Sequence, residues 1–221
     1  MVKRSLFALT AALIVAVAIT MYVVLYLTNV PGSARAAQTS AGTELYLATV
    51  PAAALNDPHP SWVSYYQTNV HDTNWQHKTT YIVPADTLVH VTVFQYDGDS
   101  GLRNPFLSQA TGTVGGTFTL DGKTTQAIDP DTASHIFAIP QLGLSVPLQG
   151  VDGNAKNQCG NAPCTLSQAH QTITFTFRTG AKGSLYRWQC FVPCAAGYID
   201  GFGGPSSTGP FISRSRNAQT Q

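Results

Sequence analysis

The chain has 221 residues, of which only 10% are charged, and its formal net charge is +1. Nothing in this composition supplies the basic stripe that a phosphate backbone attracts, so we expect no nucleic-acid partner. Without the apolar N-terminus, roughly 175 residues remain, which suffices for one domain with a substantial core. Frequent Gly and Pro, together with Thr, Val, Ile, Phe and Tyr, predict a β-protein with many turns.

The N-terminal segment contains an uncharged, mostly apolar run from residue 6 to residue 27. About 20 apolar residues span a bilayer as a helix. Lys3 and Arg4 precede the run, so the positive-inside rule places the following domain outside the cell. A cleaved signal peptide is the alternative, because residues 34–36 form an A-x-A site. We predict a single-pass anchor (or uncleaved signal) at residues 1–28, in the cell membrane, with an extracytoplasmic C-terminal domain.

The remaining chain divides into three expected parts. Residues 29–42 are small and polar and read as a flexible linker. A domain over residues 43–215 follows, and residues 216–221 form a polar tail. The strand candidates in this domain are residues 44–50 (which a short helix would also fit), 62–70, 79–83, 88–96, 118–120, 135–139, 172–178 and 184–190.

Two of these candidates alternate cleanly between apolar and polar residues. Residues 88–96 place Val89, Val91 and Val93 on one face, and residues 172–178 alternate Thr with Ile or Phe. Such alternation is typical of strands that cover a core on one side. Seven or eight short strands without a convincing helix after the anchor predict an all-β domain, either a β-sandwich or a barrel.

The domain has four cysteines, which allow three pairings. Cys159 and Cys164 lie in a polar loop, residues 149–169, and we expect them to form a local disulfide, which an extracytoplasmic domain permits. Cys190 and Cys194 have three residues between them at the exit of a strand. They could direct two thiolates at one metal ion or close as a second disulfide.

A histidine upstream adds a third candidate metal ligand. His135 begins the segment His-Ile-Phe-Ala-Ile-Pro-Gln-Leu-Gly, which ends at Gly143. One imidazole and two thiolates form a soft ligand set, which suits copper or zinc. The sequence has no nucleophile, metalloprotease or phosphate-loop motif, so we name no catalytic residues, and hydrolase chemistry has no motif to support it.

Both segments resemble ligand motifs of the cupredoxin domain of cytochrome c oxidase subunit II. That family has a His-x-Phe-x-x-Pro-x-Leu-Gly run followed by Cys-x-x-x-Cys-x-x-x-His-x-x-Met, and here the two motifs occur in the same order over roughly residues 75–205. The resemblance implies a cupredoxin-like Greek-key β-sandwich. It also implies copper bridged by the thiolates of Cys190 and Cys194, with the carbonyl of Val192 as a further ligand. In the family this centre receives electrons from cytochrome c.

The chain departs from the family at two ligand positions. Tyr198 stands where the family has its second histidine, and Gly201 stands where it has methionine. The metal ligands that the resemblance carries over are therefore His135, Cys190, Val192 and Cys194, with Tyr198 as an additional candidate.

Two functions follow as expectations. The first is copper binding and electron transfer at a modified site, at most as a subunit of a respiratory oxidase or with another redox protein as partner. The second is a metal-free cupredoxin scaffold that serves as an accessory or interaction subunit of a membrane complex. A disulfide between Cys190 and Cys194 would favour the second function.

Overall fold

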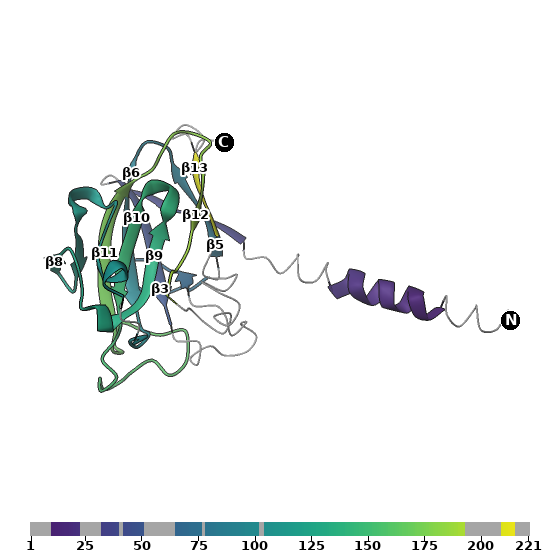
Figure 1. Cartoon of the computed structure of the whole chain (residues 1–221), viewed down its shortest axis with the longest axis horizontal. Helices are drawn as coiled ribbons and strands as arrows, with labels where there is room; N and C mark the ends of the chain where they lie inside the picture. The colour runs from purple at the N-terminus through teal and green to yellow at the C-terminus, as the bar shows by residue number, and fades with distance from the viewer. Residues whose placement is uncertain are drawn as a thin grey trace. The chain divides into compact units, whose positions relative to one another are not determined.

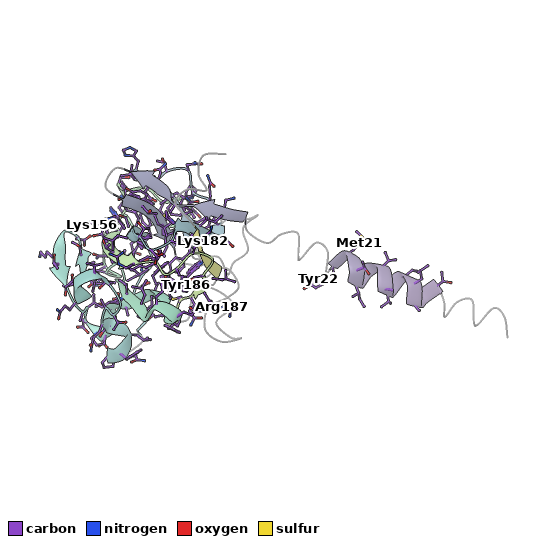
Figure 2. The ribbon with its side chains drawn as sticks, turned by 90° about the horizontal axis from the view of Figure 1, so that it is seen from above. Met21, Tyr22, Lys156, Lys182, Tyr186 and Arg187 are labelled. Atoms are coloured by element: carbon purple, nitrogen blue, oxygen red, sulfur yellow. A yellow bond between two sulfur atoms is a disulfide. The ribbon has the colours of Figure 1, made fainter. Side chains whose placement is uncertain are left out.

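The computed structural model describes residues 10–22, 32–39, 42–50, 65–76, 78–101, 104–192 and 209–214. The chain divides into two compact units, Met1–Pro31 and Gly32–Gln221. In the first unit residues 10–22 are α-helical, and Met21 and Tyr22 project from this helix with exposed side chains (Figure 2). Among the described residues, no helix combines the length and apolar character needed to span a bilayer. The anchor at residues 1–28 falls partly outside the described residues and stays a prediction.

The second unit is built from β-sheet, as predicted (Figure 1). The larger sheet has the order β2-β3-β6-β11-β7-β8, and β4 pairs with β3. Its strands β3 and β6 run parallel, whereas its other neighbours are antiparallel. The bounds are β2 Ala37–Thr39, β3 Gly42–Thr49, β4 Tyr65–Gln67, β6 Leu88–Gln95, β7 Phe118–Leu120, β8 Lys123–Thr125 and β11 Gln171–Arg178.

The remaining strands form a four-stranded sheet, in the order β1-β5-β13-β12, and an antiparallel hairpin of β9 and β10. A backbone bridge between Ala138 and Gln189 links β9 to the residue that follows β12. The bounds are β1 Gly32–Arg35, β5 Lys78–Pro84, β9 Ala133–Ile139, β10 Leu144–Gln149, β12 Leu185–Trp188 and β13 Gly209–Arg214. Four 3₁₀ turns complete the described elements: η2 Pro105–Ser108, η3 Val114–Gly116, η4 Pro130–Thr132 and η5 Pro140–Leu142.

One apolar core receives side chains from both sets of strands, which makes the unit a two-layered β-sandwich. The alternation in residues 88–96 and 172–178 is confirmed, because the apolar face of each strand is buried in this core. The larger sheet contributes Leu45, Leu47, Val89, Val91, Val93, Phe118, Ile173, Phe175 and Phe177, and the opposite layer contributes Tyr81, Val83, Ile136, Ile139, Leu144, Val146, Leu148 and Trp188.

The prediction of a flexible linker is wrong for residues 32–39. Gly32–Arg35 runs parallel to β5, and Ala37–Thr39 runs antiparallel to β3. Between them Ala36 donates its backbone N–H to the carbonyl of Ile82 at 3.0 Å and is only 3% exposed. Sheet edges pair with any backbone that offers free N–H and C=O groups, so small side chains do not prevent strand formation. The folded unit therefore begins at Gly32.

The long loop before β11 is closed by a disulfide, as predicted. Cys159 and Cys164 are bonded, and both are buried. Together with Tyr66 and Tyr96 they belong to a second, smaller apolar cluster. The loop is therefore packed onto the sandwich by its own disulfide.

Candidate metal centre

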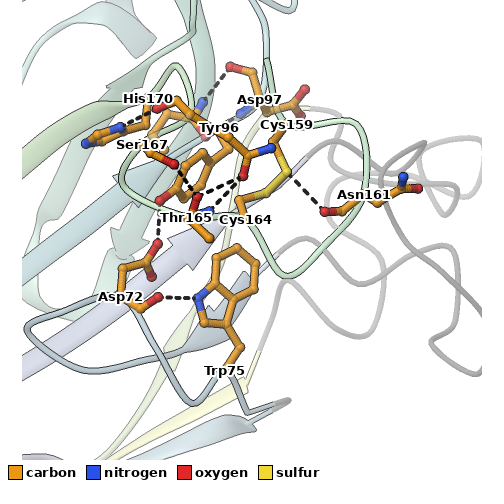
Figure 3. Close-up of a disulfide and its surroundings, with 12 residues drawn as sticks. Asp72, Trp75, Tyr96, Asp97, Cys159, Asn161, Cys164, Thr165, Ser167 and His170 are labelled. Atoms are coloured by element: carbon orange, nitrogen blue, oxygen red, sulfur yellow. Dashed lines mark hydrogen bonds between the residues drawn. A yellow bond between two sulfur atoms is a disulfide. The ribbon is translucent and has the colours of Figure 1, made fainter. Parts of the chain in front are cut away.

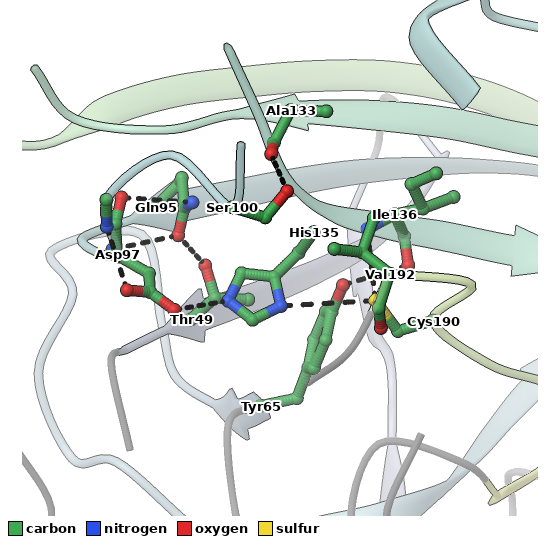
Figure 4. Close-up of polar contacts among 11 residues, drawn as sticks. Thr49, Tyr65, Gln95, Asp97, Ser100, Ala133, His135, Ile136, Cys190 and Val192 are labelled. Atoms are coloured by element: carbon green, nitrogen blue, oxygen red, sulfur yellow. Dashed lines mark hydrogen bonds and ion pairs between the residues drawn. The ribbon is translucent and has the colours of Figure 1, made fainter. Parts of the chain in front are cut away.

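His135 lies in the middle of β9, a strand in which every residue is buried. The residue is only 1% exposed. A buried imidazole needs hydrogen-bond partners, because an unpaired polar group away from water is costly. Its Nε2 lies 2.9 Å from Oδ2 of Asp97 (Figure 4). Since the carboxylate accepts, Nε2 carries the proton, and Nδ1 has the lone pair in the neutral ring.

Asp97 is held in place just after the end of β6. The Asp97 N–H donates to Oε1 of Gln95 at 3.1 Å, and its Oδ1 accepts the N–H of Gly98 at 2.8 Å. Gln95 is fully buried and also bonds to the hydroxyl of Thr49. Figure 4 shows these contacts fixing the carboxylate beside His135. The imidazole orientation is thus set by a partner 38 positions away in the sequence.

Cys190 approaches the other side of the imidazole. The bridge between Gln189 and Ala138 brings the exit of β12 against β9, and Cys190 Sγ lies 3.9 Å from Nδ1 of His135. The N–H of Ile136 donates to the same sulfur at 3.3 Å. Cys190 is 0% exposed. One sulfur and one imidazole nitrogen therefore face each other inside the protein.

The backbone after Cys190 turns back toward its sulfur. The carbonyl oxygen of Val192 lies 3.4 Å from Sγ, and Val192 is fully buried. Cys190 is disulfide-bonded, and its partner lies outside the described residues. A disulfide sulfur has no hydrogen to donate, so the approach of the Val192 carbonyl is a close contact that a thiol would turn into a hydrogen bond.

Aromatic rings close the site on the core side. The hydroxyl of Tyr65 donates to the carbonyl of Ile136 at 3.0 Å, and its ring stands edge-on to His135 at 5.7 Å. Trp188 lies 5.2 Å from Tyr65 and stacks on Phe137 at 5.8 Å. Burial raises the pKa of Tyr65 well above its usual value, so the phenol stays neutral. On this side the imidazole and the sulfur are therefore buried against aromatic rings.

The structure brings together three of the five predicted ligands. His135, Cys190 and Val192 converge, whereas Cys194 and Tyr198 lie outside the described residues and stay predictions. Among the described residues no group of three or more His, Cys, Asp or Glu side chains is arranged to hold a metal ion. The sequence interpretation missed Asp97. Its signal was an acid at the end of a strand, which many turns also have.

No protein-family model matches the sequence, and no curated protein matches it. Among solved structures the chain is similar to rusticyanin from Thiobacillus ferrooxidans, with 14% identity over 84% of this chain and 85% of that chain and a TM-score of 0.32. Another structure of rusticyanin, a copper protein, shares 15% identity over 82% of each chain, with a TM-score of 0.33. Auracyanin B shares 15% identity over 84% of this chain and 98% of its own, with a TM-score of 0.27. These likenesses are too weak to support a conclusion about function.

Proposed function

We propose that the protein is a membrane-anchored, extracytoplasmic cupredoxin-like protein that binds copper in its reduced form and transfers electrons. The observation that carries this proposal is the buried pair of His135 Nδ1 and Cys190 Sγ, 3.9 Å apart. These two atoms belong to the two motifs that resemble the cupredoxin domain of cytochrome c oxidase subunit II, and the motifs occur in the same order as in that family. The two-layered sandwich is the architecture that the resemblance implies.

The donor atoms fit a soft metal ion once Cys190 is a thiolate. Imidazole nitrogen and thiolate sulfur suit copper, and a copper ion bound there would supply one-electron transfer. Asp97 plays the part that carboxylates often play behind ligating histidines, since it holds Nε2–H and fixes the ring so that Nδ1 faces the sulfur. The carbonyl of Val192 is the nearest additional oxygen donor. His135, Cys190 and Val192 are buried, and the ring of Tyr65 packs edge-on against the imidazole.

The disulfide at Cys190 sets a condition on this function. A cystine sulfur lacks the thiolate charge that binds a metal ion, so the bond must first take up two electrons and two protons to give two thiols. We propose that the disulfide form is the oxidised, metal-free state of the site. A thiol reductant of the extracytoplasmic space would supply the electrons, and deprotonation of Cys190 would then complete the ligand.

Copper uptake by the reduced full chain tests this proposal. The protein is reduced, freed of reductant without air, and titrated with Cu(I) in competition with a chromophoric chelator. We expect one site of higher affinity than the chelator, and strong thiolate charge-transfer absorption with Cu(II). His135→Ala and Cys190→Ser should each remove the site. His90→Ala is the matched control. His90 is hydrogen-bonded to Thr176 where β6 pairs with β11, so its replacement should leave copper uptake unchanged.

A metal-free scaffold is the second candidate, and the disulfide-bonded state of Cys190 favours it. In this case the disulfide of Cys190 would hold the end of β12 in place, and the protein would act as an accessory subunit of a membrane complex. The same titration separates the two functions. Absence of Cu(I) uptake by a chain with verified free thiols would exclude the copper protein and leave the scaffold.

The membrane location is part of the proposal and rests on the uncharged run over residues 6–27 behind Lys3 and Arg4. We expect the expressed chain to stay in the membrane pellet after a carbonate wash, and a protease added outside the cell to reach the domain. Recovery of a soluble form that begins near Ala37 would show cleavage at the A-x-A site and end the anchor proposal.

A further inference from the structure

A cavity of about 360 Å³ lies between the strand β4 and the disulfide loop, and the described candidate ligands His135, Cys190 and Val192 are not among its lining residues. The described walls come from two segments that are far apart in the sequence, residues 66–75 and residues 162–165. Tyr66 comes from β4, Asp72 and Trp75 come from the turn that follows, and residues 162–165 come from the loop closed by Cys164. Figure 3 shows Asp72, Trp75 and the disulfide grouped around this region.

Asp72 is the only carboxylate among the described residues that line the cavity, and it is 3% exposed. The hydroxyl of Tyr96 donates to its Oδ2. Its Oδ1 is buried and has no hydrogen-bond partner within the described part of the chain. A buried carboxylate oxygen without a donor is unfavourable, so this atom needs a partner that the described residues do not supply.

The turn that carries Asp72 is rigid, so the carboxylate is fixed in position. Oδ1 of Asn69 accepts the backbone N–H groups of His71 and Thr73 at 3.0 and 3.1 Å. The indole N–H of Trp75 donates to the backbone carbonyl of Asp72 at 3.1 Å (Figure 3). Asp72 itself adopts a left-handed conformation, with φ of 50°. A preorganised acceptor loses little freedom when a ligand binds.

Aromatic rings surround the carboxylate. Trp75 is partly exposed, and its ring lies 5.4 Å from Tyr66 and 5.9 Å from Tyr96. The faces of such rings carry partial negative charge and attract cations. No lysine or arginine is among the described residues that line the cavity, and burial raises the pKa of Asp72 against the opposing effect of hydrogen bonds from neighbouring side chains.

We propose that this cavity binds the primary ammonium group of a small organic amine. One N–H of the ammonium donates to Oδ1 of Asp72, and the charge lies against the ring of Trp75. The carbon chain of the amine packs on Tyr66 and Pro163. The geometry disfavours other ligand classes. An anion would meet Asp72, a divalent metal would find one carboxylate where it needs several oxygen ligands, and a neutral sugar would leave the buried charge uncompensated.

Titration of the full chain with n-butylammonium chloride, in non-ionic detergent, tests the site. We expect saturable binding by calorimetry, and a shift of the Trp75 indole N–H resonance, assigned through Trp75→Phe. Asp72→Asn should weaken binding by at least about tenfold, because it removes the charge that the ammonium faces. Asparagine tolerates the left-handed conformation at this position, so the variant keeps the turn.

Two controls keep the outcome decisive. n-Butanol has the same carbon chain without the charge and should bind much more weakly. Asp121→Asn removes a carboxylate in the β7–β8 turn, also at positive φ, and should leave the affinity for n-butylammonium unchanged. Absence of saturable binding, equal binding of n-butanol, or an affinity that Asp72→Asn does not alter would each overturn the proposal. Binding of glucose in place of the amine would overturn it as well.

Discussion

Replacement of Trp188 by alanine should destabilise the sandwich more than any other single truncation in β12. Trp188 is 0% exposed and contacts the rings of Tyr65, Tyr81 and Phe137 at centroid distances of 5.2, 5.4 and 5.8 Å. Truncation of a buried tryptophan costs about 3–5 kcal/mol, and each aromatic pair adds about 0.5–1.5 kcal/mol. We therefore expect Trp188→Ala to lower the free energy of unfolding by at least about 4 kcal/mol.

Equilibrium unfolding of the full chain in urea, followed by far-UV circular dichroism in detergent, measures this loss. Leu185→Ala provides the matched control, because Leu185 lies on the same strand and is 65% exposed. We expect the control to change stability by less than about 0.5 kcal/mol. Trp188→Phe keeps a ring and should give an intermediate loss. A loss below about 2 kcal/mol for Trp188→Ala would refute the reasoning from its burial and ring contacts.

Three further outcomes can be measured in the same assay. Replacement of both Cys159 and Cys164 by serine opens a ring with a sequence separation of 5, so the chain-entropy model predicts a loss of about 2 kcal/mol; no loss would show that the loop is held by other contacts. Thr179→Val removes a hydroxyl that serves two buried backbone groups of the β5–β6 turn, and it should lower stability by about 1–3 kcal/mol. Burial raises the pKa of Asp72 above its unfolded value, so its charged form opposes folding at neutral pH. Asp72→Asn should therefore be more stable than the wild type near pH 7, and this advantage should shrink as the pH falls toward about 4 and be absent below it, where Asp72 is protonated in both states; an unchanged difference between variant and wild type across this range would contradict the raised pKa.

Much of the sheet could be predicted, because periodicity reports burial directly. Phe118–Leu120 matches β7 residue for residue, and the Asp-Gly pair after it forms the expected hairpin turn, with both φ angles positive. The missed strand β10 shows where this method fails. Its Pro147 argues against a strand, but β10 pairs with β9 along one edge, where a proline is tolerated. Such edge positions depend on partners elsewhere in the chain, which periodicity does not reveal.

The candidate site was predictable only where its atoms share a motif. His135, Cys190 and Val192 belong to short segments with fixed spacing, and the structure brings them together. Asp97 belongs to no motif, and it meets His135 only because the exit of β6 lies beside β9 in the folded sandwich. The cavity beside Asp72 was missed for the same reason, since residues 66–75 and the distant residues 162–165 form it together.

The two candidate functions of the metal centre require different redox states of Cys190. The copper protein needs its thiol, and the scaffold keeps its disulfide. The N–H of Ile136 and the ring of His135 both lie near Cys190 Sγ, at 3.3 and 3.9 Å. A donor N–H stabilises a thiolate more than a neutral disulfide sulfur, because a hydrogen bond to a charged acceptor is the stronger one. The N–H of Ile136 therefore favours the reduced state, and every 30 mV of that preference corresponds to about 1.4 kcal/mol in the two-electron couple. Measurement of the reduction potential against glutathione would decide which state prevails. A potential below about −300 mV, as in structural disulfides, would make the scaffold the resting function. A higher value would leave the thiols available and support the copper protein.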